Sequence, residues 1–253
     1  MKYYGELLNL GLFSKEQINQ LTGNPDTAKT FLKNAIQGGY IGRIRHNYYA
    51  VKSLETRRVI PNRFAIGSEI NPSAYISHHT AFEYYGMANQ VYGTVYVSSV
   101  AKFQDFSHDD VEYKYLSSKQ NFGIVSPSSN IKVTDMERTI LDNVKDFDKI
   151  GGLEELLRCL SMVTVVSEEK LLKYLAEYKS QFLYQKVGYI LSHYKNMKLS
   201  DVFFDSCKNK ISKSKRYLYD GIQYESPKYY SEWQIFALAD LMKLINEGGE
   251  AIV

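Results

Sequence analysis

The stretch SKEQINQLTGNPDTAKTFLKNAIQGGYIGRIRHNYYAV, residues 14–51, contains the clearest folding signals of this 253-residue chain. Ser14 is followed three residues later by Gln17, a capping box that predicts the start of a helix. Gly23-Asn24-Pro25 should end that helix, because Gly and Asn tolerate the left-handed backbone of a turn. A second helix is expected from about Asp26, which either caps it or places negative charge in its first turn.

The second helix is expected to have two distinct faces and to end at Gly38-Gly39. Its apolar residues recur at helical spacing and should face a core: Ala28, Phe31, Leu32, Ala35 and Ile36. Short polar and basic residues lie toward the opposite side: Thr27, Lys29, Thr30, Lys33 and Asn34. Such a helix buries one side and offers the other to solvent or to a ligand.

A β-hairpin is predicted directly after this helix. Residues 40–45 and 48–51 are strand-like, and His46-Asn47 between them suits a tight turn because Asn47 accepts a positive φ. A short helix is also expected over Tyr3–Leu10. Helix, turn, helix and hairpin within about 50 residues is the order of a winged helix-turn-helix, whose second helix enters the DNA major groove.

Charge distribution favours a nucleic-acid ligand for this head. Residues 1–60 carry nine Lys and Arg against four Asp and Glu, whereas residues 61–253 carry 22 against 24. The predicted DNA-binding residues are those of the polar helix face and three on the hairpin: Thr27, Lys29, Thr30, Lys33, Asn34, Arg43, Arg45 and His46. The alternative is a helix pair and hairpin that pack on the rest of the protein, with the charges as a solvated face.

The predicted fold class is α+β, with a winged helix-turn-helix over residues 1–58 and a mixed α/β domain with a helical C-terminal part over residues 59–253. Strands are expected near residues 74–76, 94–98, 111–116, 122–125 and 131–134. Helices are expected near residues 78–85, 135–144, 152–160, 167–178 and 182–194. Ser77 is the expected N-cap of the first of these helices, and Thr134 or Asp135 that of the second.

Composition excludes several classes of protein. No apolar run approaches the roughly 20 residues of a membrane span, and the first ten residues do not resemble a signal peptide. The two cysteines, Cys159 and Cys207, have no metal-site spacing and are interpreted as reduced thiols. We therefore expect a cytoplasmic protein without a membrane partner.

A search for catalytic chemistry yields weak signals. Gly67-Ser68 is typical of the opening of a nucleotidyltransferase site, but that site needs alternate rather than adjacent carboxylates, and Asp109-Asp110 would face opposite sides of a strand. His79 and Glu83 lie four residues apart, yet no third metal ligand stands out. No nucleophile triad, P-loop or dinucleotide fingerprint is found. We therefore predict no catalytic residues, no metal and no cofactor.

Two further segments, which follow the predicted winged helix-turn-helix, resemble those of a known family. Residues 75–87, YISHHTAFEYYGM, and residues 133–142, VTDMERTILD, resemble segments of the AbiEi family of antitoxins. The second resembles the family's Thr-x-x-Glu-Arg-Thr-Leu-Leu-Asp, and a strand at Thr94–Val97 follows the first. The resemblance covers roughly residues 5–195. This chain differs in having Phe82 where Leu is usual, and in its aromatic-rich tail.

The resemblance implies a transcriptional autorepressor and antitoxin. AbiEi proteins are encoded beside a nucleotidyltransferase-like toxin in phage-defence systems, bind inverted-repeat operators through the winged helix, and need the C-terminal domain to neutralise the toxin. Expected partners are therefore double-stranded DNA and the cognate toxin. The family supplies no catalytic residues, and only the polar face of the second helix and the hairpin cations carry over.

Two alternatives stay open at this point. One is a one-component regulator whose large domain senses a small ligand, which predicts a sizeable apolar pocket. The other is a nucleotidyltransferase-type enzyme, which predicts carboxylates clustered around Gly67-Ser68. A second basic run, Lys208–Arg216, is interpreted as a solvated loop, although DNA flanks or an acidic partner are possible contacts.

Overall fold

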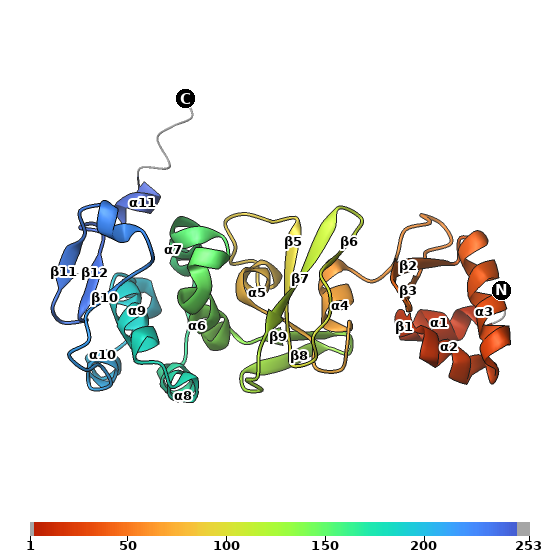
Figure 1. The fold of residues 1–253 in the computed structure, drawn as a ribbon, viewed down its shortest axis with the longest axis horizontal. Helices are drawn as coiled ribbons and strands as arrows, with labels where there is room; N and C mark the ends of the chain where they lie inside the picture. The colour runs from red at the N-terminus through yellow and green to blue at the C-terminus, as the bar shows by residue number, and fades with distance from the viewer. Residues whose placement is uncertain (1–2, 247–253) are drawn as a thin grey trace, which may run out of the picture. The chain divides into compact units, whose positions relative to one another are not determined.

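The computed structural model describes residues 3–246 and has a mixed α+β fold (Figure 1). The chain divides into two compact units. The first contains Met1–Ile76, Gly93–Lys119 and Ser126–Val133. The second contains Ser77–Tyr92, Gln120–Val125 and Thr134–Val253. This division differs from the predicted boundary at residue 58, because strands that follow it in sequence group with the amino-terminal elements.

The first elements of the chain, at the red end of the ribbon in Figure 1, follow the predicted order. They are α1 (Tyr4–Leu10), β1 (Leu12–Ser14), α2 (Lys15–Thr22), α3 (Pro25–Gln37), β2 (Ile41–Arg45) and β3 (Tyr48–Val51). The strands form an antiparallel sheet in the order β1-β3-β2. The capping box of α2 is confirmed, since Ser14 and Gln17 bond each other's backbone amides. Strand β1 was not predicted.

A six-stranded sheet follows, in the order β6-β7-β5-β4-β9-β8. Its elements are α4 (Arg63–Ser68), β4 (Tyr75–Ile76), β5 (Thr94–Ser99), β6 (Phe106–His108), β7 (Val111–Ser117), β8 (Ile124–Ser128) and β9 (Ile131–Thr134). Helix α4 packs closely on the sheet because Gly67 lacks a side chain. A Cβ added there would lie 2.8 Å from the Ile76 Cδ1 atom. Helix α4 and strand β6 are additional to the predicted elements.

The second unit is mainly helical and confirms the predicted series of helices. Its helices are α5 (His78–Tyr84), α6 (Met136–Asp146), α7 (Gly152–Met162), α8 (Glu168–Tyr178), α9 (Gln181–Leu191), α10 (Asp201–Lys208) and α11 (Lys243–Asn246). A small sheet of β10 (Arg216–Tyr217), β12 (Ile235–Ala237) and β11 (Lys228–Tyr230) completes it. The core includes Phe82 of α5 and Ile140 of α6, both fully buried.

The ends of α5 and α6 show which capping predictions hold. Asp135 caps α6 by accepting the Arg138 amide at 3.0 Å. Ser77 occupies the N-cap position of α5 but makes no capping bond. Its hydroxyl instead lies 2.8 Å from Nδ1 of His78, which has a positive φ of 56°. The prediction that Ser77 is the N-cap residue of α5 is therefore confirmed by its position, although its side chain does not bond the helix amides.

Candidate nucleic-acid interface

A tight turn positions α3 after α2. Gly23 closes α2 with a φ of 74°, which its missing side chain permits without strain. Asn24 then caps α3, because its side-chain oxygen accepts the amides of Asp26 at 2.8 Å and Thr27 at 3.1 Å. The cap is thus Asn24 rather than Asp26, which supplies negative charge in the first turn of α3 as expected.

Helix α3 separates its buried and exposed sides much as predicted. Ala28, Leu32 and Ala35 are buried in a core with Leu7 and Ile18. Ile36 is the exception, being 41% exposed. The five predicted DNA-binding residues of this helix are all exposed: Thr27, Lys29, Thr30, Lys33 and Asn34. A depression of about 440 Å³ is lined by Asp26, Thr27, Thr30, Phe31 and Asn34.

The hairpin places its two arginines in different surroundings. Asn47 has a φ of 57°, as the turn requires, and His46 beside it is exposed. Arg43 is exposed, whereas Arg45 is partly buried. A register shift between Arg43 and Arg45 interrupts the regular pairing of β2 with β3. A bulge of this kind redirects side chains that simple strand alternation would place on one face.

Arg45 is held by neighbouring parts of its own unit. Its Nη2 donates to the Ile70 carbonyl oxygen at 3.3 Å, and its guanidinium lies 5.6–5.9 Å from the ring centres of Tyr48, Phe103 and Phe106. Burial lowers the pKa of Arg45 below the ordinary arginine value. These contacts give Arg45 a packing role, in contrast to the DNA contact expected from the sequence.

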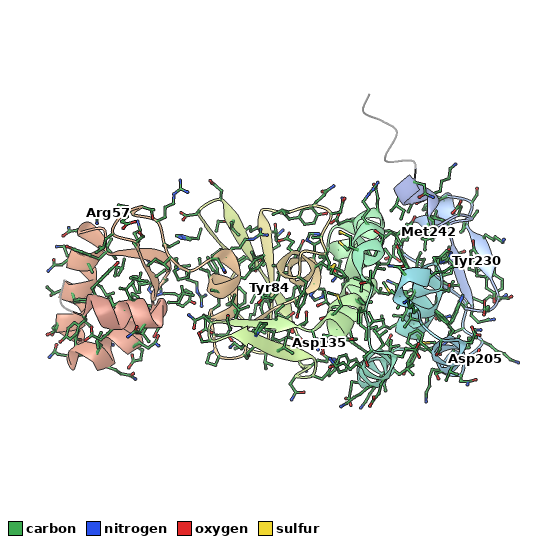
Figure 2. The ribbon with its side chains drawn as sticks, turned by 180° about the vertical axis from the view of Figure 1, so that it is seen from behind. Arg57, Tyr84, Asp135, Asp205, Tyr230 and Met242 are labelled. Carbon is green, nitrogen blue, oxygen red and sulfur yellow. The ribbon has the colours of Figure 1, made fainter. Side chains whose placement is uncertain are left out.

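A group of cations that the sequence analysis did not single out lies close to Arg43. A cleft of about 570 Å³ is lined by Gly42, Arg43, Lys52, Arg57, Arg58, Val59, His108, Asp109 and Asp110. Arg57, labelled in Figure 2, donates to the Gly38 carbonyl oxygen at 3.5 Å. This long contact places a cation at the C-terminal end of α3, where the helix dipole favours positive charge. Only the basic character of residues 1–60 pointed to these residues.

The residues considered for nucleotidyltransferase chemistry have different surroundings in the first unit. Ser68 is fully buried, and its hydroxyl accepts the Lys132 amide at 2.6 Å. Asp109 and Asp110 form the turn between β6 and β7 with positive φ values of 47° and 62°. They line the cationic cleft, whose lining does not include Gly67 or Ser68.

The structure brings further potential ligands to His79, contrary to the view that no third metal ligand stands out. Glu155 and Cys159 lie beside it, and the three ligand atoms are within 4.8 Å of one another. These residues are 76 and 80 positions away along the chain, so sequence spacing gave no signal. All three are buried in the second unit.

The basic run at 208–216 is partly engaged within the second unit. Lys208 pairs with Asp205 at 3.3 Å and with Glu232 at 2.5 Å. The Lys215 Nζ lies 4.9 Å from the ring centre of Tyr229. Lys210, Lys213 and Arg216 are exposed. These contacts agree with a mostly solvated segment that is anchored at some of its cations.

Comparison with known proteins gives a fold relationship. No family model and no curated protein matches the sequence. The structure is similar to the crystal structure of the RV2827C protein from Mycobacterium tuberculosis, with a TM-score of 0.64 over 94% of this chain and 90% of that chain. The two sequences are 12% identical, so the similarity concerns the fold alone. Among residues 3–246, no helix combines the length and apolar character needed to span a bilayer.

Proposed function

We propose that residues 3–51 form a winged helix-turn-helix that binds duplex DNA, with α3 in the major groove. The observation that carries this proposal is the wholly exposed polar face of α3, which joins short hydrogen-bonding side chains to two lysines. The order of α2, turn, α3 and the β2–β3 hairpin supports the proposal. Helix α2 precedes α3 and packs in the same hydrophobic core, as the first helix of such a motif does.

The exposed residues divide by the contacts they suit. Thr27, Thr30 and Asn34 have short polar side chains that can reach base edges in the major groove. Lys29 and Lys33 suit phosphates, which provide affinity and register but no base discrimination. His46 and Arg43 extend this surface onto the hairpin, and Lys52, Arg57 and Arg58 supply additional cations for the DNA backbone. Arg45 takes no part in the proposed contact.

The proposal is tested with a triple variant that removes cations from the proposed surface, Lys29→Ala, Lys33→Ala and Arg43→Ala. The probes are a duplex from upstream of the protein's own gene and a duplex of random sequence, each titrated at several salt concentrations. We expect weaker binding to both duplexes, and a salt dependence that flattens by about one unit of log–log slope for each lost phosphate contact.

A matched variant removes three cations elsewhere: Lys210→Ala, Lys213→Ala and Lys215→Ala. It changes the net charge equally, so it separates a local interface from a general charge effect. We expect its DNA affinity and salt slope to remain close to those of the unmodified protein. Equal losses in the two triple variants, or no loss in the first, would remove α3 and the hairpin as the interface.

We further propose that this DNA binding serves autorepression and that the protein is an antitoxin against a nucleotidyltransferase-like toxin. The support is the resemblance of residues 75–87 and 133–142 to AbiEi segments. In this fold those residues form α5 and α6. The resemblance therefore supports an architecture shared with AbiEi proteins and does not identify a surface that contacts the toxin. When a nucleotidyltransferase encoded in the same operon arrests growth, co-expression of this protein should restore growth. The α3 triple variant should restore growth equally well. Continued growth arrest with the unmodified protein would contradict the antitoxin role.

A further inference from the structure

A buried cluster of metal-binding residue types lies between two helices of the second unit. Helix α5 contributes His79, and α7 contributes Glu155 and Cys159, which are four residues apart and therefore on one face of that helix. Their residue exposures are 2%, 5% and 0%. Neither the proposed DNA interface nor the antitoxin role uses this cluster.

The distances in the cluster suit a zinc-class ion. The His79 Nε2 lies 2.9 Å from Glu155 Oε1, and Cys159 Sγ lies 3.4 Å from the same oxygen. In tetrahedral zinc sites, the metal–ligand bonds of about 2.0–2.3 Å place ligand atoms about 3.2–3.8 Å apart. The His79–Glu155 pair therefore needs to separate by a few tenths of an ångström to admit the ion, the Cys159–Glu155 pair is already within the range, and all three ligand atoms lie within 4.8 Å of one another. Nitrogen, sulfur and carboxylate oxygen are the usual ligands of zinc.

Outer contacts hold the two polar ligands in place. Glu83, whose side chain is 1% exposed, puts an oxygen 3.1 Å from the other ring nitrogen of His79, Nδ1, a close contact without hydrogen-bond geometry. A carboxylate at the second nitrogen is the arrangement that orients metal-binding histidines. Glu155 accepts the Gln90 amide at 3.0 Å and the Asn89 side chain at 3.2 Å. These partners hold Glu155 by two hydrogen bonds and place a carboxylate beside His79 before any ion arrives.

Without an ion, His79 simply lies between Glu83 and Glu155. That arrangement gives Cys159 no role beyond a weak thiol contact. Within residues 3–246, no Lys or Arg pairs with the Glu155 carboxylate. A buried carboxylate is stabilised by a paired charge or by a metal, and a divalent ion would supply that positive charge beside Glu155.

We propose that His79, Glu155 and Cys159 bind one zinc-class divalent ion, with Glu83 orienting His79. Water would reach the fourth position past Glu155, which lines a cleft of about 130 Å³ together with Gln90, Tyr92, Gly151, Glu154 and Arg158. On binding, the Cys159 thiol releases its proton to solvent and bonds the metal as a thiolate. No electron is transferred, so the site needs no co-reactant.

The test uses the full-length protein after treatment with a chelator. Zinc titrated against a chromophoric competitor should bind with a stoichiometry of one per chain. Cobalt, which reports its ligands by absorbance, should give a tetrahedral visible spectrum and a near-ultraviolet thiolate charge-transfer band. Glu83→Gln should weaken zinc binding about 10–100-fold, as loss of a metal ligand's supporting partner does.

The two buried cysteines provide a matched pair of variants. Cys159→Ser should abolish the thiolate band, whereas Cys207→Ser, on α10, should retain it together with unit stoichiometry. Circular dichroism checks that each variant is folded. A cobalt spectrum of the unmodified protein without a thiolate band would overturn the proposal even if Cys159→Ser failed to fold. A band that survived in Cys159→Ser would overturn it too.

Discussion

Helices α3 and α6 begin alike and use their polar residues in opposite ways. Each starts at a side-chain cap, Asn24 for α3 and Asp135 for α6, and each has an acidic first turn. The polar face of α3 is exposed along its length, whereas Glu137, Arg138 and Asp142 of α6 are buried. Polar residues thus face solvent in one helix and the protein interior in the other.

The polar residues of α6 are satisfied by a network inside the second unit. Arg138 donates from Nε to Asp142 at 2.9 Å and from Nη1 to the Phe122 carbonyl oxygen at 2.9 Å. Asp135, labelled in Figure 2, accepts the Tyr174 hydroxyl at 2.9 Å. Burial opposes the charge on Lys170, but its contacts with Asp135 outweigh that effect and raise its pKa. Residues with this many internal partners are expected to control stability.

The largest loss of stability among the variants that test this comparison is expected for substitution of Arg138. Arg138→Ala leaves the Asp142 carboxylate buried without its guanidinium, and breaking a buried pair in this way costs about 3–5 kcal/mol. We expect a large fall in the urea midpoint for the second unit, monitored by circular dichroism.

Arg158 provides the control for that substitution. It pairs with Glu154 on α7 at 2.9 Å, but the pair is solvent-exposed. Arg158→Ala should therefore change stability by less than about 1 kcal/mol. If the two variants lost similar amounts of unfolding free energy, burial would not explain the different roles of the polar residues in α6 and on exposed helix faces.

Local signals made the amino-terminal elements predictable. The Ser14–Gln17 capping box, the Gly23-Asn24-Pro25 turn and the Asn47 hairpin act within a few residues, and the structure contains each of them. Strand β1 was missed because its three residues are defined by pairing with β3, some 36 positions later. Long-range pairing leaves no periodic signal in so short a segment.

The candidate site was predictable in part. Exposure of the polar face of α3 follows from its helical period, and five of the predicted residues lie there. The packing of Arg45 could not be foreseen, since it depends on Ile70, Phe103 and Phe106 from later in the chain. The same limit applies to His79 and Glu155, which tertiary structure alone brings together.

An intermediate effect is expected from the two hairpin arginines, which repeat the comparison within one strand. Arg45→Ala removes a hydrogen bond and three ring contacts, so we expect a loss of about 1–2 kcal/mol in unfolding free energy. Arg43→Ala should leave stability nearly unchanged and reduce DNA affinity. Thermal unfolding and DNA titration of both variants provide the measurement. A stability loss at Arg43 equal to that at Arg45 would contradict the division between packing and binding.

The smallest stability effect is expected from two asparagines of α3. Asn24→Ala removes the side-chain acceptor for the Asp26 and Thr27 amides, and loss of such a cap costs about 1 kcal/mol. Asn34→Ala lies inside the helix on the exposed face, where alanine is the better helix former, so stability should stay level or rise by up to about 0.5 kcal/mol. Of these two asparagines, only Asn34 faces the groove in the proposed complex. Its substitution should therefore lower discrimination between operator and random duplex while the fold remains intact, and a protein that discriminates equally well without Asn34 would remove that side chain from the base-reading set.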